Sequence, residues 1–88
     1  MATISVFLGI TITMFYNEHP PAHFHADYGE YNATYEVETL RVVRGGLPNR
    51  SHRYVIEWAR VHRNELLENW TRMREGQSPR RIAPVDLG

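Results

Sequence analysis

Apolar and polar residues alternate along TISVFLGITITMFY, residues 3–16, as they do in a half-buried antiparallel strand. A turn around Gly9 divides the stretch into two strands, because glycine tolerates turn conformations that other residues avoid. The prolines of NEHPP, residues 17–21, end the second strand, since proline has no N–H to donate. The expected inward positions are Ile4, Val6, Leu8, Ile10, Ile12, Met14 and Tyr16.

A second hairpin is predicted over residues 23–36, with Tyr28-Gly29 as a two-residue turn. In that register His25 faces Asn32 and Phe24 faces Ala33, so like residues oppose one another. The expected polar face consists of His23, His25, Asn32, Thr34 and Glu36, and the apolar face of Phe24, Ala26, Tyr31, Ala33 and Tyr35. A further turn near Glu38-Thr39 returns residues 40–44 as the next strand, with Glu36 facing Arg41 and Tyr35 facing Val42.

From about Asn49 the apolar residues recur with the spacing of a helix, after a proline at position 48 that suits a helix start. One apolar arc consists of Tyr54, Val55, Trp58, Val61 and His62, and a second, rotated arc consists of Leu66, Leu67, Trp70 and Met73. The rotation predicts two helices meeting near Arg63-Asn64, with Asn64 as the N-cap of the second. Gly76 is expected to end that helix.

Together these patterns predict an α+β fold. An antiparallel β-meander of about four or five strands is followed by two helices, either a helical hairpin or a kinked pair, packed on one face. Residues 1–78 are expected to form a single domain, and residues 79–88 an extended, loosely held tail. A chain of 88 residues has a modest core, so a homodimer or a partner protein would add stability.

Composition narrows the function classes. The chain has no cysteine, which excludes disulfides, thiolate zinc sites and a cysteine nucleophile. Ten basic and ten acidic residues give zero net charge, so no overall field attracts nucleic acid. The start lacks the features of a secretion signal, and no apolar run approaches the roughly 20 residues of a membrane span. We therefore expect a cytoplasmic protein without membrane contact.

The densest chemistry lies in HPPAHFHADYGEY, residues 19–31. His23 and His25 are two residues apart on a strand, so both imidazoles point the same way, and His19 in the preceding loop can join them. Such a cluster binds zinc, nickel or iron, with Asp27, Glu30 or Glu36 as an oxygen ligand. The same imidazoles can act as general acid and base, or can be ordinary polar surface residues.

All ten basic residues are arginine, a bias that codon usage explains more simply than binding of phosphate or of an acidic partner does. Four of them share the side of the first helix away from Trp58, namely Arg50, Arg53, Arg60 and Arg63. That side suits a phosphate backbone or an acidic protein. It is equally a solvated face, in which Arg53 pairs with Glu57 one helical turn away.

Three segments resemble DUF4160, a domain-of-unknown-function family of small prokaryotic proteins. They are TISVFLGI near the start, HPPAHFHADYGEY in the middle and EWARVHRNELLENW in the helices. The chain departs from the family pattern in the spacing of Pro20-Pro21-Ala22 and at Leu40, where a glycine is more usual. The resemblance implies that such a gene neighbours that of another small protein, in a layout like a toxin–antitoxin operon.

From the resemblance and the residues together we expect the toxin of such a pair, acting on RNA as a metal-independent ribonuclease without a cofactor. His23 and His25 would be acid, base or phosphate contacts, assisted by His19 and Tyr28. One alternative is a non-catalytic module, an antitoxin or regulatory subunit, that binds the neighbouring gene's protein. Another is a metalloprotein that holds a divalent transition metal with His19, His23 and His25.

Overall fold

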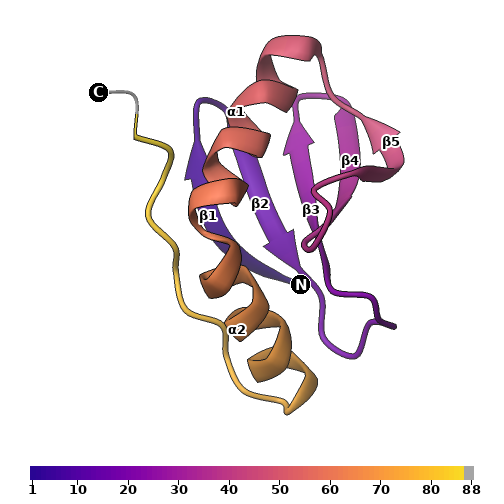
Figure 1. Ribbon diagram of the computed structural model, residues 1–88, viewed down its shortest axis with the longest axis vertical. Coiled ribbons are helices and arrows are strands. Elements are labelled where there is room, and N and C mark those ends of the chain that lie inside the picture. The colour runs from indigo at the N-terminus through magenta and orange to yellow at the C-terminus, as the bar shows by residue number, and fades with distance from the viewer. Residues whose placement is uncertain (87–88) are drawn as a thin grey trace.

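A computed structural model of the chain describes residues 1–86 (Figure 1). It has one five-stranded antiparallel sheet of order β1-β2-β3-β4-β5, followed by two helices. The elements are β1 (Ala2–Phe7), β2 (Ile10–Met14), β3 (His23–Tyr28), β4 (Tyr31–Glu36), β5 (Val42–Gly46), α1 (Asn49–Val61) and α2 (Arg63–Arg74). The predicted α+β meander is confirmed.

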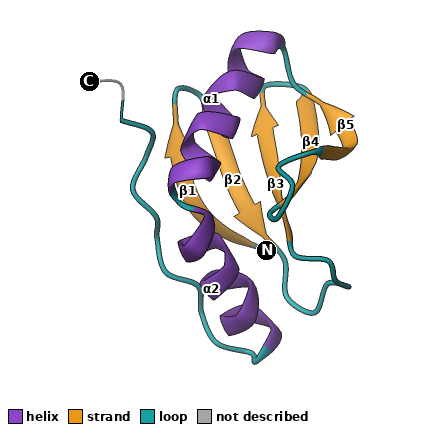
Figure 2. Cartoon of the chain, in the orientation of Figure 1, coloured by secondary structure: helices purple, strands orange, loops and turns teal. Residues whose placement is uncertain are grey.

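Both helices lie on one face of the sheet and follow one another in nearly the same direction (Figure 2). They are therefore the kinked pair and not the helical hairpin. Their junction is His62, which occupies the N-cap position of α2, so the predicted N-cap at Asn64 is wrong. α2 runs past the end of the sheet at which β3 begins (Figure 1), and this brings it near the start of that strand.

A β-bulge in β1 changes which of its side chains reach the core. The register shifts between Thr3 and Ser5 opposite β2, and alternation reverses beyond that point. Phe7 is consequently buried, whereas Val6 and Leu8 are 49% and 45% exposed, contrary to the expected inward positions. The turn itself is where the sequence predicts it, with Leu8 and Gly9 both at positive φ, as a type I′ turn requires.

The second hairpin turns one residue later than predicted, at Gly29-Glu30. Gly29 has a φ of 57°, and a two-residue turn of type II′ places glycine at its first central position. His25 therefore opposes Thr34, and Phe24 opposes Tyr35. The pairing differs from the prediction by two residues, an even number, so the predicted polar and apolar faces are preserved.

The last strand begins and ends two residues later than expected, at Val42 and Gly46, and has the expected length. Its pairing with β4 agrees with the prediction, since Tyr35 opposes Val42 and the Glu36 N–H donates to the Arg41 carbonyl at 3.0 Å. Gly45 has a φ of 69°, and a Cβ there would lie 2.0 Å from the carbonyl oxygen of Asn32. Only glycine therefore fits this position of β5.

The core lies between the sheet and the helices and is centred on Trp58. Its ring is 5.2 Å from Phe7 and 6.0 Å from Phe24 between centroids. Val55 and Ala59 are buried beside it, but Val61 is 75% exposed, contrary to the predicted arc. Val61 lies about 120° around the helix from Val55, so it stands at the margin of the apolar face.

The C-terminal segment is anchored, so the expectation of a loosely held tail is wrong. The helix ends at Arg74, Gly76 follows at a positive φ of 77° as a helix-terminating glycine, and residues 77–86 then run back in an extended path beside the helices (Figure 1). Ile82 is buried and its N–H donates to the Ile4 carbonyl at 2.8 Å, while the Trp58 indole N–H donates to the Ala83 carbonyl at 2.7 Å. Residues 87–88 of the predicted tail lie outside the described residues.

Asn69 holds the tail from the helix side. Its side chain is 1% exposed, donates to the Arg80 carbonyl and accepts from the Arg80 N–H, both at 2.8 Å. Replacing Asn69 with alanine leaves both backbone groups unpaired. We expect Asn69→Ala to lower the free energy of unfolding by about 2–3 kcal/mol in chemical denaturation, and to expose the tail to proteases.

The matched control is Asn64→Ala on the exposed face of the same helix. It should change stability by less than about 0.5 kcal/mol, because Asn64 caps nothing. Equal losses in the two variants would contradict the anchoring role of Asn69.

Tyr35 gives the core a response to alkaline pH. It is fully buried, its hydroxyl is hydrogen-bonded to His52 Nδ1 at 2.9 Å, and burial raises its pKa to about 12. Its contribution to stability is fully present below the unfolded pKa of about 10, and is lost as pH rises through about 12. Relative to Tyr35→Phe, the wild type should lose about 2 kcal/mol over that range in denaturant titrations. A stability difference that stays constant with pH would contradict this.

Candidate functional site

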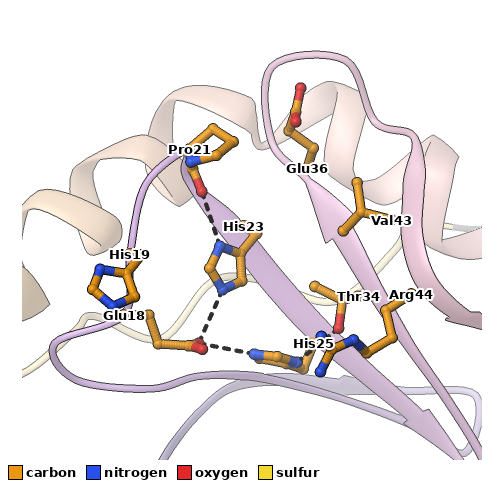
Figure 3. Close-up of a pocket in the computed structure, with 9 residues that line it drawn as sticks. All are labelled: Glu18, His19, Pro21, His23, His25, Thr34, Glu36, Val43 and Arg44. Atoms are coloured by element: carbon orange, nitrogen blue, oxygen red, sulfur yellow. Dashed lines mark hydrogen bonds and ion pairs between the residues drawn. The ribbon is translucent and has the colours of Figure 1, made fainter.

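A pocket of about 400 Å³ opens on the sheet face opposite the core, at the end of the sheet where β3 begins (Figure 3). It is built from the polar face of β3, β4 and β5 and from the loop between β2 and β3. The lining residues are Glu18, His19, Pro21, His23, His25, Thr34, Glu36, Val43 and Arg44. The histidine-bearing strand is therefore part of a concave site.

Glu18 joins the two strand histidines. His23 and His25 lie on the same side of β3, as their spacing predicts, and one carboxylate oxygen of Glu18 faces both. Its Oε1 is 3.1 Å from His23 Nε2 and 2.9 Å from His25 Nε2 (Figure 3). Glu18 lies in the loop that ends β2, and the sequence offered no pattern to identify it.

The second nitrogen of each ring also has a partner. His23 Nδ1 donates to the Pro21 carbonyl at 2.9 Å, and His25 Nδ1 is hydrogen-bonded to the Thr34 hydroxyl at 3.1 Å. No ring nitrogen of His23 or His25 is thus open to a substrate in this arrangement. Direct proton exchange with a substrate requires Glu18 to move aside.

Aromatic contacts hold both imidazoles in place. Trp70 of α2 packs on His23 with 4.9 Å between ring centroids, and Phe15 meets His25 edge-on at 4.5 Å. The two imidazoles lie 5.4 Å apart. Their side chains are only 16% and 15% exposed, so their orientation is set by packing as well as by hydrogen bonds.

Two opposed effects act on the Glu18 carboxyl. Burial raises the pKa of Glu18, whereas hydrogen bonds and charge interactions with His25 and His23 lower it. The lowering is the larger effect, so the pKa of Glu18 is below its usual value. Glu18 is accordingly an ionised acceptor at neutral pH. It can hold protons or a cation between the imidazoles.

Arg44 is a second pocket residue that the sequence analysis did not single out. A bulge between Thr34 and Tyr35 in the β4–β5 pairing sets Arg44 opposite Thr34, on the polar face. Without the bulge, alternation from Val42 would turn Arg44 towards the core. Arg44 now lines the same pocket as the two histidines, at the side where Thr34 and His25 lie, and its guanidinium can meet an anion there (Figure 3).

Of the remaining predicted site residues, some line the pocket and others lie elsewhere. His19 is exposed and lines the pocket, but Tyr28 stands at the far end of β3, where its ring packs against Gly9. Of the three oxygen ligands considered, Glu36 alone lines the pocket. The Asp27 carboxylate accepts a hydrogen bond from Asn32 instead, and Glu30 is in the hairpin turn.

The four arginines of the first helix do not form one surface. Arg53 and Arg60 border a separate shallow hollow of about 320 Å³ on α1, together with His52, Ile56 and Glu57. Arg50 is exposed outside that hollow, and Arg63 is half-buried, donating its Nε–H to the Val37 carbonyl at 3.2 Å. Arg63 therefore has a structural contact.

The family model described as "Domain of unknown function (DUF4160)" matches residues 9–71, which include the whole pocket. The chain belongs to this family. No curated protein and no solved structure matches the chain. In residues 1–86 of this DUF4160 protein, neither helix is long and apolar enough to cross a membrane.

Proposed function

We propose that this DUF4160 protein is the toxin-type component of a two-protein module and acts on RNA at the histidine pocket. The observation that supports this best is that His23, His25 and Arg44 line one pocket on the open face of the sheet. Imidazoles are the usual side chains of phosphodiester chemistry near neutral pH, and a guanidinium binds phosphate oxygens bidentately. The family resemblance adds the expectation of a toxin–antitoxin-type neighbour.

The pocket of about 400 Å³ has room for a nucleotide phosphate, and Arg44 lines it. It also contains the carboxylates of Glu18 and Glu36, which repel phosphate. A cation held at Glu18 would remove that repulsion and would let the pocket accept an anion.

The test is induced expression in bacteria. Wild-type protein should slow growth and cleave added RNA, and the double variant His23→Ala/His25→Ala should do neither. Arg44→Ala should reduce RNA cleavage by about tenfold or more, because one charged phosphate contact is worth about 1.5–3 kcal/mol. Growth curves and gel analysis of RNA measure both effects.

Two matched controls separate the pocket from the rest of the surface. Arg53→Ala removes an arginine from the hollow on α1, and Tyr28→Phe removes a hydroxyl at the far end of β3. Both variants should behave as wild type. If wild type and the histidine variant, each folded by circular dichroism, permit equal growth, the toxin role is wrong.

Partner binding without catalysis is a second candidate function, supported by strand β5. All five residues of this edge strand are exposed, including Val43 at 58%. An exposed edge pairs readily with a strand from another protein. The partner in this case is the neighbouring gene's protein.

Co-expression with that neighbouring gene tests the second candidate. The partner should co-purify with wild-type protein, and Val43→Pro should reduce the complex, because proline at an edge removes a backbone donor. Tyr31→Phe, at the end of β4 next to the β3–β4 turn, is the control and should retain the partner. A protein that stays strictly monomeric in the presence of that product has no such role.

A further inference from the structure

We propose that Glu18, His23 and His25 form a binding site for one divalent transition-metal ion of the zinc type. One donor atom from each residue lies within 4.8 Å of the other two, and within residues 1–86 no other group of three such side chains does so. The site differs from the one expected from sequence, since Glu18 takes the place of His19. Metal binding stands on this geometry alone, and only its use on RNA rests on the proposed function.

The spacing of the donors fits a metal ion. In a tetrahedral zinc site, bonds of about 2.0–2.1 Å place neighbouring ligand atoms about 3.3–3.4 Å apart. The Glu18 oxygen is 3.1 Å and 2.9 Å from the two imidazole nitrogens, so a shift of a few tenths of an ångström would admit the ion. The same two-histidine, one-carboxylate donor set occurs in zinc and non-haem iron enzymes.

The hydrogen bonds of His23 are those of a metal ligand. A carbonyl oxygen only accepts, so the contact with Pro21 requires the hydrogen of His23 to be on Nδ1. In the neutral form of His23 the Nε2 lone pair then faces Glu18 Oε1, and a proton on Nε2 would donate to that oxygen. A metal ion can take the place of that proton between the two atoms. A metal-bound histidine almost always donates its other N–H to a carbonyl or carboxylate in this way.

His25 has the matching arrangement. Its Nδ1 is hydrogen-bonded to the Thr34 hydroxyl, which can accept a hydrogen bond from an Nδ1–H. In that tautomer the lone pair of Nε2 faces Glu18. Trp70 and Phe15 pack against the two rings, so the ligands are positioned before a metal arrives. Preorganised ligands of this kind favour binding, since little side-chain freedom is lost.

Three protein ligands leave a coordination position open, as in catalytic zinc sites. All three ligands line the pocket, and its other residues include His19, Glu36 and Arg44. The open position can hold a water molecule or an oxygen of an anionic ligand, with Arg44 as a further contact. The ligand class implied is therefore a phosphate ester.

The experiment uses untagged protein, stripped with chelator and titrated with Zn²⁺ by calorimetry, with Co²⁺ as a spectroscopic probe. Wild type should bind one Zn²⁺ per chain, gain thermal stability with Zn²⁺, and show visible Co²⁺ bands of a four-coordinate site. Glu18→Gln and His23→Ala should each weaken Zn²⁺ binding by well over about tenfold, and Thr34→Val by about tenfold through His25. His19→Ala is the matched control and should stay within about threefold of wild type.

Three results of these measurements would overturn the proposed metal site or its ligand set. Less than about a tenth of an equivalent of Zn²⁺ bound by wild type, or affinity unchanged in Glu18→Gln, overturns it. A loss in His19→Ala equal to that in His23→Ala assigns a different ligand set and also overturns it. Glu18→Gln preserves side-chain size, so it remains informative if His23→Ala fails to fold.

The two proposals fail separately. Zinc binding with wild-type growth unaffected leaves the metal site standing and removes the RNA function. Wild-type protein that is toxic and cleaves RNA but binds no Zn²⁺ removes the metal site and leaves the RNA function standing.

Discussion

The indole of Trp58 lies against Phe7 and Phe24 on the face of the sheet that the helices cover. This contact determines where α1 lies on the sheet and, through the indole N–H bonded to Ala83, where the tail runs. In a chain of 88 residues such a shared anchor has a large effect, since a small core offers few alternative contacts. The tail, α1 and the sheet are consequently coupled through one side chain.

The same packing supports the pocket on the other face. Phe24 points into the core while its neighbours on β3, His23 and His25, point outwards, because side chains alternate along a strand. The core therefore fixes the backbone that presents the imidazoles. Trp70 extends this support, since it reaches His23 from the part of α2 that passes the end of the sheet. The helical segment of the DUF4160 match thus contributes directly to the site.

Within the pocket, the position of one carboxylate decides which chemistry is available. Glu18 engages both Nε2 atoms, so the imidazoles are not free to exchange protons with a substrate in this arrangement. Held in this way they are better placed to coordinate a cation, whose charge would also offset the carboxylates of Glu18 and Glu36 in the pocket that Arg44 lines. The proposed metal binding and the proposed action on a phosphate ester are therefore connected by the charge balance of the pocket.

Local patterns in the sequence determined the strands, the helices and the two faces of the second hairpin, because alternation and helical period depend on near neighbours. They also placed His23 and His25 side by side, since two residues on one strand must point the same way. Other features were decided by tertiary structure alone. The bulges that turn Val6 outwards and Arg44 into the pocket depend on how neighbouring strands pair, and Glu18 reaches the histidines only through the path of its loop. The anchored tail likewise depends on contacts with Ile4 and Asn69, distant in sequence, which no local pattern encodes.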